Sequence, residues 1–393
     1  MKTKFDIIIV GGGLVGLTAA IACAQSGLSI AVIDRCARDD MPNDFRASAI
    51  AASGMRMFAR LGVDLGDKTQ AITDMVAYEG SLAEPWKIHF DEADKLGSMV
   101  ENIDLRAALL ARFDAFENLH MIAPAEISSH NHVSSGVDVH LKGQKSPLTA
   151  KLLIAADGRN SHLRRAAGIT VQATPYNQRA LVTIIKHSLP HDGLALQRFM
   201  RGGPLAVLPL PQNRSQIVWS DRAEAIEALE QLSQIDFIDI LQERMGDYLG
   251  DITLETLRQS YPLGLQIADK FTAQRLALIG DAAHVIHPLA GQGLNLGLRD
   301  VAALSEGIGL AHKRGLDIGV AALLDYDVWR NADIRAMGGV THSLNLIFGV
   351  KNSLIGHIRR SGMKSVNDAS RLKGLFMQNA AGNLGDLPRL MRM

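Results

Sequence analysis

The chain has 393 residues, in which 41 lysines and arginines balance 41 aspartates and glutamates, and it contains only two cysteines. This length exceeds one typical hydrophobic core and excludes a small disulfide-stapled scaffold. An apolar content of 47% excludes global disorder, and the balanced charge gives no reason to expect a nucleic-acid partner. Cys23 and Cys36 form at most one disulfide, and no cluster of Cys and His has zinc spacing. We therefore predict a globular protein of a reducing compartment, without a metal site.

The first apolar segment, residues 7–33, carries no charged side chain. Hydropathy alone would make it a membrane span or a signal peptide. Three consecutive glycines at 11–13 interrupt it, however, and would weaken a spanning helix. A strand at 5–10, a helix at 14–25 and a second strand at 29–34 explain the pattern better. An integral membrane protein is therefore not expected.

A glycine-rich turn joins the first predicted strand to the helix. Gly11, Gly13 and Gly16 have the G-x-G-x-x-G spacing of a dinucleotide-binding (Rossmann) turn, and Asp34 ends the next strand. Such glycines let the chain approach a pyrophosphate at a helix N-terminus, and the acid accepts hydrogen bonds from the adenosine ribose. An acid here disfavours the 2′-phosphate of NADPH, but the motif alone does not choose between FAD and a nicotinamide. The first part of the predicted cofactor site also includes the neighbours Leu14, Val15 and Arg35.

A second motif follows an apolar strand predicted at 275–280. It begins at Gly280 and, over residues 281–300, reads Asp-Ala-Ala-His-Val-Ile-His-Pro-Leu-Ala-Gly-Gln-Gly-Leu-Asn-Leu-Gly-Leu-Arg-Asp. This string resembles the flavin-proximal motif of the FAD-dependent aromatic monooxygenases, the single-component group that includes p-hydroxybenzoate hydroxylase. More narrowly, it resembles the ubiquinone-biosynthesis hydroxylases of the UbiH type. The resemblance spans nearly the whole chain and implies FAD as the bound cofactor and NAD(P)H as a transient reductant.

The residues of this second motif have expected roles. We expect Asp281 to end a strand beside the first strand of the chain, so that its carboxylate can bind the ribitol hydroxyls of FAD. A helix that starts near Asn295 would point its positive end at the flavin ring, where reduced flavin carries negative charge. The predicted cofactor contacts of this motif are Gly280, Asp281, Gly291, Gly293, Leu294 and Asn295. The predicted catalytic positions are His284 and His287, as an acid or base or as residues that shape the turn, and Pro288 as a wall on the substrate side.

A third motif and two arginines extend the expected cofactor site. Asp157 and Gly158 follow an apolar strand at 152–156 and resemble the family's Asp-Gly motif, which is associated with FAD and NAD(P)H binding. The alternative is a capped turn without ligand contact. Arg46 matches a family position near the flavin and the nicotinamide path, and Arg106 matches one near the FAD phosphates. A surface arginine is the alternative at each position.

The middle of the chain predicts a substrate domain. Short β-rich runs lie at 180–186, 195–199, 205–210 and 216–220, and a helix is predicted after them at 224–245. The resemblance implies an antiparallel sheet that covers one face of the flavin. It places three residues near the substrate, Leu208, Pro209 and Trp219. For Trp219, a place in the ordinary hydrophobic core is the alternative.

These elements predict an α/β fold class in three parts. A discontinuous Rossmann-like FAD-binding domain is expected at 1–75, 100–174 and 268–316. An antiparallel β-sheet substrate domain is expected at 76–99, as a hairpin, and at 175–267. A C-terminal helical region is expected at 317–393, with helices at 320–335, 344–358 and 371–379.

The last segment of the chain is basic. Residues 351–393 contain eight basic and two acidic side chains, a net charge of +6. Together with the apolar residues Leu346, Ile347, Phe348 and Leu354, this tail suggests peripheral contact with an anionic membrane surface, where a polyprenyl substrate resides. The alternative is a solvated basic face packed on the FAD-binding domain. We accordingly predict a cytoplasmic protein, with peripheral contact at the inner membrane under the first interpretation.

The resemblance implies a function. The implied enzyme hydroxylates the aromatic ring of a polyprenylated phenol in ubiquinone biosynthesis, using NAD(P)H and O2 through a peroxyflavin. Other ubiquinone-biosynthesis proteins are its expected partners. Two alternatives stay open, a hydroxylase or epoxidase of another secondary metabolite and a flavin-binding scaffold without turnover. A free aromatic acid is less expected as substrate, because Arg198 and Arg201 are the only arginine pair near the predicted sheet.

Overall fold

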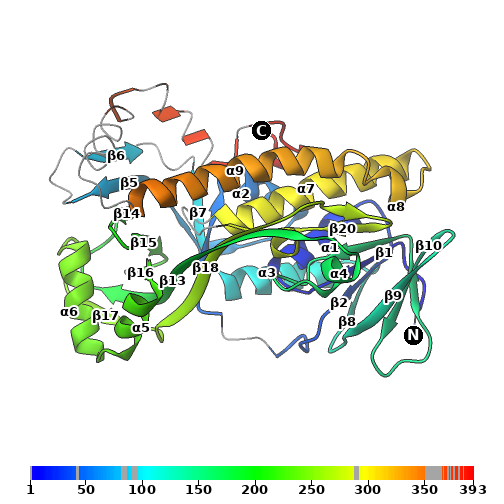
Figure 1. The fold of residues 1–393 in the computed structure, drawn as a ribbon, viewed down its shortest axis with the longest axis horizontal. Coiled ribbons are helices and arrows are strands. Elements are labelled where there is room, and N and C mark those ends of the chain that lie inside the picture. Colours follow the sequence, from blue (N-terminus) through cyan, green and yellow to red (C-terminus); the bar gives the residue numbers. More distant parts are fainter. Residues whose placement is uncertain are drawn as a thin grey trace.

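The computed structural model describes most of the chain (Figure 1). The described residues are 2–40, 44–80, 86–90, 96–286, 292–349, 365, 367–369, 371, 373–374, 377–378, 381–383 and 385–393. Three predicted site residues, His287, Pro288 and Gly291, lie outside them. About half of the basic tail, residues 351–393, also lies outside.

The predicted dinucleotide-binding sheet is present, with six strands in the order β19-β20-β12-β1-β2-β8. Its strands are β1 (Ile7–Val10), β2 (Ile30–Ile33), β8 (Leu119–Ile122), β12 (Leu152–Ala155), β19 (Thr272–Ala273) and β20 (Leu276–Leu278). All neighbours pair in parallel except β19 and β20. The central strands are short apolar runs because both faces of a parallel sheet are buried.

One expectation about this sheet is wrong. The strand that precedes Asp281 was expected beside the first strand, but β20 pairs with β12, and β12 separates it from β1. Asp281 still reaches the same carboxyl edge of the sheet, because β1, β12 and β20 all run in parallel.

Helices and two small sheets surround this sheet. The helices are α1 (Leu14–Ala24), α2 (Ala52–Leu61), α3 (Asn102–Asp114), α4 (His162–Ala166) and α7 (Gln292–Lys313). One small sheet joins β9 (Ile127–Val133), β10 (Gly136–Leu141) and β11 (Leu148–Ala150). The other joins β3 (Ala47–Ala51), β7 (Gly97–Glu101) and β4 (Thr69–Ala71). In the same region lie the 3-10 turns η1 (Gly66–Lys68) and η3 (Gly280–Ala282).

The predicted substrate sheet forms the other half of the molecule (Figure 1). Its main path is β21-β18-β13-β16-β15-β14-β5-β6, and β17 pairs with β13. The strands are β5 (Asp74–Glu79), β6 (Lys87–Phe90), β13 (Val171–His187), β14 (Leu194–Phe199), β15 (Pro204–Leu210), β16 (Arg214–Arg222), β17 (Ile252–Leu254), β18 (Gln259–Ala268) and β21 (His284–Val285). Its pairs are antiparallel apart from β14 with β5, and β5 and β6 form the expected hairpin.

Two predicted helical segments differ from the structure. The segment 224–245 is two helices, α5 (Ala223–Gln231) and α6 (Gln234–Met245), because the Ser233 hydroxyl accepts the N–H of Asp236 and starts a new helix.

The helices predicted at 320–335 and 344–358 differ as well. A short α8 (Ile318–Ala321) comes first, and then α9 (Tyr326–Gly349) runs through the predicted gap without a break. A Cβ on Gly338 would lie 3.0 Å from Ile267, so this glycine permits close packing on β18 rather than ending the helix. Across the described ranges, no helix combines the length and apolar character needed to cross a membrane.

The C-terminus returns to the FAD-binding side. The turn η5 (Arg389–Met391) lies against α2, where the guanidinium of Arg56 donates to the carbonyl of Met391 at 3.0 and 3.1 Å. The turn at 389–391 is therefore part of the packed fold.

Candidate functional site

A cavity of about 700 Å³ lies where the dinucleotide-binding sheet, the β3-β7-β4 sheet and the substrate sheet meet. The predicted residues that line it are Gly13, Leu14, Val15, Gly16, Asp34, Arg35, Arg46, Arg106, Gly158, Leu208, Asp281, Gly293, Leu294 and Asn295. Six described residues of the predicted set are not part of the lining: Gly11, Asp157, Pro209, Trp219, Gly280 and His284.

The three glycines of the turn have different surroundings. Gly13 leaves space for a ligand, whereas Gly11 and Gly16 let other parts of the backbone approach closely. A Cβ on Gly16 would lie 1.9 Å from the carbonyl oxygen of Gly11, and one on Gly11 would lie 2.1 Å from that of Ala156. A Cβ on Gly13 would meet no protein atom within 4 Å. Gly13 is also the N-cap of α1 and offers no side chain to its first N–H groups. Those donors therefore face the cavity, as a bound pyrophosphate requires.

Asp34 and Arg106 flank this turn. The carboxylate of Asp34 accepts the N–H of Gly12 at 2.5 Å and that of Cys36 at 2.8 Å, which fixes its position at the cavity edge. Arg106, on α3, donates from one Nη to the carbonyl of Gly12, and its buried Nε has no partner in the described part of the protein. An unpaired guanidinium donor at a dinucleotide turn suits a phosphate oxygen.

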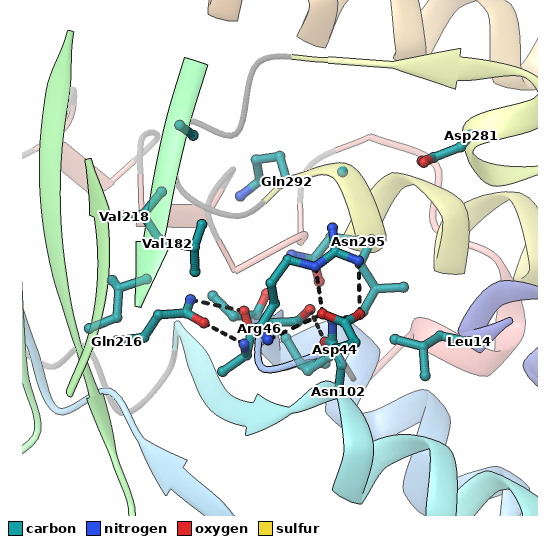
Figure 2. Close-up of a pocket in the computed structure, with 18 of the residues that line it drawn as sticks. Leu14, Asp44, Arg46, Asn102, Val182, Gln216, Val218, Asp281, Gln292 and Asn295 are labelled. Atoms are coloured by element: carbon teal, nitrogen blue, oxygen red, sulfur yellow. Dashed lines mark hydrogen bonds and ion pairs between the residues drawn. The ribbon is translucent and has the colours of Figure 1, made fainter. Parts of the chain in front are cut away.

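Asp281 lies across the cavity from the substrate sheet (Figure 2). Its carboxylate is open to the cavity, while protein surrounds its other sides. This partial burial raises the pKa of Asp281, against the opposing effect of His284, Arg46 and Arg159. A carboxylate in such a place is a fitting acceptor for ribitol hydroxyls.

His284 does not face this cavity. It is 1% exposed, and its Nε2 lies 2.6 Å from Oδ2 of the fully buried Asp300 on α7. The structure thus favours the expected alternative, in which His284 shapes the turn, over a role as acid or base. The sequence motif included Asp300, but its contact with His284 arises only when α7 packs beside η3.

Asp157, like His284, supports the site without lining the cavity, because its carboxylate caps the start of α4. Its Oδ2 accepts the N–H of His162 at 2.8 Å and that of Leu163 at 3.2 Å at the start of α4, whereas Gly158 lines the cavity with a φ of +81°. The buried Arg164 then donates to the carbonyl of Ala282 at 2.7 Å. The Asp-Gly motif therefore supports the turn that carries Asp281.

Arg46 occupies the centre of the cavity, between the two domains (Figure 2). Asp44 accepts from its Nε at 2.7 Å and from Nη2 at 2.8 Å, and its guanidinium carbon lies 4.9 Å from the ring centroid of Tyr261 on β18. Asn102 donates to Asp44 at 2.9 Å. Sequence reasoning missed Asp44, Tyr261 and Asn102, although the spacing of Asp44 and Arg46, two residues apart, was visible.

A buried side-chain amide links the backbone that follows Arg46 to the substrate sheet. The side chain of Gln216, on β16, accepts the N–H of Ala47 and donates to the carbonyl of Ala47 at 3.0 Å (Figure 2). On the cofactor side, Asn295 does the same for β3. It accepts the N–H of Ala51 and donates to the carbonyl of Ala49, both at 2.8 Å.

Alternation along the strands decides which sheet residues meet the cavity. On β16, Gln216, Val218 and Ser220 line it, while Trp219 packs behind the sheet with its ring 6.5 Å from that of Phe237 on α6. Trp219 as a cavity wall is therefore a wrong expectation, and its core alternative holds. On β15, Leu208 lines the cavity as expected, whereas Pro209 is the next residue and points to the other face.

These features together fit FAD. An open glycine turn at a helix N-terminus, a ribose-side acid, an unpaired arginine donor and a second acid in the cavity match the pyrophosphate, ribose and ribitol groups of this cofactor. A Cβ on Gly293, at the start of α7, would also meet no protein atom within 4 Å, so the backbone there is open to a flat ring. The fold and cavity define a flavoprotein whose cofactor domain shares its site with an antiparallel sheet.

Comparison with known proteins agrees with the assignment of FAD as the cofactor. Residues 4–327 match the model of the family described as FAD binding domain, and the chain belongs to this family. It is 39% identical to the ubiquinone hydroxylase UbiL of Rhodospirillum rubrum over 98% of this chain and 92% of that protein. It is 32% identical to the 3-demethoxyubiquinol 3-hydroxylase of Escherichia coli over 96% of this chain and 98% of that protein.

A solved structure has the same fold. The p-nitrophenol 4-monooxygenase PnpA of Pseudomonas putida superposes with a TM-score of 0.81 at 18% identity, over 98% of this chain and all of that chain. The Rossmann-like domain with an antiparallel substrate sheet, as expected from the sequence, is thereby confirmed.

Proposed function

We propose that this protein is an FAD-dependent hydroxylase that adds oxygen from O2 to the aromatic ring of a polyprenylated phenol in ubiquinone biosynthesis, with NAD(P)H as reductant. The two relatives above are named for hydroxylation of ubiquinone or a ubiquinol precursor. Bound FAD supplies the hydride acceptance and the oxygen chemistry, and the protein supplies binding, orientation and exclusion of water.

One observation carries the substrate class. The substrate sheet contributes no cationic side chain to the described cavity lining, and the lining arginines Arg35, Arg46 and Arg106 all come from the cofactor side. Arg198, on β14, donates to the carbonyl of Arg244 on α6, behind the sheet. A free aromatic carboxylate would therefore find no counter-charge on the sheet, whereas a neutral ring needs none.

The lining residues have separate roles in binding the cofactor and the substrate. Gly13, Asp34 and Arg106 would hold the dinucleotide half of the cofactor, and Asp281 would hold its ribitol. Asp44 holds Arg46 in place and compensates part of its charge. The sheet face, with Val182, Leu208 and Val218, gives the ring an apolar surface that excludes water.

The apolar surface continues beyond the cavity. Ile72, Leu96 and Ala195 belong both to the lining and to a buried apolar cluster shared by the β3-β7-β4 sheet and the substrate sheet. These lining residues would give a prenyl chain attached to the ring an apolar wall to contact within the cavity.

The test is oxygenation by the purified, FAD-loaded protein. A short-chain 2-prenylphenol is incubated with NADH or NADPH under ¹⁸O2, and the products are analysed by mass spectrometry. The proposal expects substrate-stimulated NAD(P)H oxidation and a product that carries one ¹⁸O. NAD(P)H oxidation that no prenylated phenol stimulates would contradict it and favour a scaffold. Stimulation by other aromatic metabolites alone would move the substrate elsewhere.

A further inference from the structure

One polar side chain on the substrate sheet is buried, faces the cavity and has no partner. Gln197, on β14, is 7% exposed and lines the cavity. Throughout the described residues, its amide forms no hydrogen bond, in contrast to Gln216, which is fully engaged with Ala47. Its amide atoms are not among the fully enclosed polar atoms without a partner, so they are open to the cavity, where an amide offers two donors and two acceptor positions to a ligand.

The surroundings of Gln197 make it prominent on this face. In the sheet register it pairs with Ala206 on one side and with Ala77 on the other. The same cross-strand row continues through Val218 and Val182. These small or apolar neighbours cannot form hydrogen bonds with the side-chain amide of Gln197, and they leave it open to the cavity.

We propose that the amide of Gln197 is the hydrogen-bond partner of a neutral oxygen substituent, a phenol hydroxyl, on the aromatic ring of the substrate. This inference rests on the proposed function and names the residue that recognises the ring. An amide can accept from a hydroxyl and donate to its oxygen without bringing charge into an apolar cavity. Such a partner discriminates strongly against a ring that lacks the hydroxyl, because the protein's polar group is then left unpaired.

The alternative is that Gln197 serves the fold. The structure gives that alternative little support, since the amide stabilises no other described group. Substitution by methionine, which keeps the length and removes the hydrogen-bonding atoms, should therefore leave the melting temperature of the FAD-loaded protein unchanged or raise it. A residue with a structural role would lower it.

Ligand binding by the FAD-loaded protein tests the inference without turnover. The probes are a short-chain 2-prenylphenol and the matching prenylbenzene, and binding is followed by the change in flavin absorption. We expect Gln197→Met to weaken binding of the phenol about tenfold and to leave that of prenylbenzene within about twofold of the wild type. Arg198→Leu, the next residue on the same strand but behind the sheet, is the matched control and should change neither.

Several results would overturn the inference. They are equal losses for both probes, no loss for the phenol, a fall in FAD affinity, or a wild type that binds both probes equally or neither. If Gln197→Met fails to fold, Gln197→Leu takes its place. Failure of the proposed function is a separate result: the wild type would prefer the phenol over prenylbenzene, with Gln197 responsible, and yet form no oxygenated product.

Discussion

Nε2 of His284 lies 2.6 Å from Oδ2 of Asp300, and the same carboxylate oxygen accepts the backbone N–H of Gly280 at 2.9 Å. The other oxygen of Asp300 accepts from Nε of Arg330, on α9, at 2.8 Å. Burial alone would raise the pKa of Asp300, but the neighbouring His284 and Arg330 hold it below its usual value. One buried carboxylate thus connects α7, α9 and the turn that presents Asp281 to the cavity.

Replacement of this carboxylate should unfold the site. Asp300→Asn removes one of the two carboxylates that pair with the buried Arg330 and leaves Asp333 as the other, so we expect a loss of about 3 kcal/mol in the free energy of unfolding, measured with urea at pH 7. The loss should shrink as the pH falls, because a carboxyl with a lowered folded pKa stabilises above its unfolded pKa, about 3.9, and stops doing so as it protonates.

An exposed aspartate serves as the control for this experiment. Asp386, whose side chain is 78% exposed, pairs with Arg392 at 3.4 Å, and Asp386→Asn should cost less than about 1 kcal/mol. Equal losses in the two variants would contradict the role assigned to Asp300.

His284 should influence hydroxylation only through the position of the turn. We expect His284→Gln to lower the flavin content and the melting temperature, because a buried partner of Asp300 is weakened. The pH profile of kcat, normalised to bound flavin, should keep the apparent pKa values of the wild type. Disappearance of one ionisation from that profile would show instead that His284 transfers a proton.

The features that sequence reasoning found are local ones. The turn of Gly11, Gly13 and Gly16 is specified by spacing along the chain, and the buried parallel strands beside it are continuous apolar runs. The break at Ser233 and the continuity of α9 at Gly338 were missed. A cap depends on one hydroxyl contact, and the glycine in α9 is explained only by the strand that packs against it.

The substrate face could not be predicted because both faces of that sheet are buried. One face meets α5 and α6 and the other meets the cavity, so β16 shows no clear alternation of polar and apolar residues. The choice of Trp219 over Val218 was therefore wrong by one position. Gln197 could have been noticed as a polar residue within an apolar strand, but only the register shows that it faces inward.

The roles of Gly13 and Gly16 in the glycine turn can be separated by single substitutions. Gly13 has a φ of −73°, which any residue adopts, and open space at its Cβ position, so Gly13→Ala should leave the melting temperature of the apoprotein unchanged. FAD affinity should fall about tenfold or more, since the methyl group occupies the space of the pyrophosphate. Equilibrium titration of the apoprotein with FAD measures this.

Gly16→Ala provides the contrast. Its methyl group would lie 1.9 Å from the carbonyl of Gly11, so the strand and helix must separate and the apoprotein itself should be destabilised. If Gly13→Ala destabilised the apoprotein as much as Gly16→Ala, or bound FAD normally, the cofactor would not approach the turn at Gly13.

Asp281 should strengthen FAD binding and, at the same time, lower the stability of the apoprotein. Its pKa is raised in the fold, so its charged form is disfavoured relative to the unfolded chain. That destabilisation is absent below the unfolded pKa, about 3.9, and grows as the pH rises through the folded value. Asp281→Asn should therefore make the apoprotein more stable than the wild type at pH 7, with the difference vanishing near pH 4.

FAD binding should respond in the opposite direction. The asparagine lacks the charge that strengthens hydrogen bonds from ribitol hydroxyls, so the dissociation constant for FAD should rise about tenfold at pH 7. Urea unfolding of both apoproteins between pH 4 and 8, together with FAD titration, measures the two effects. An apoprotein that Asp281→Asn destabilises at pH 7 would mean that this carboxylate supports the fold itself, and that its place in the cavity is not explained by the cofactor.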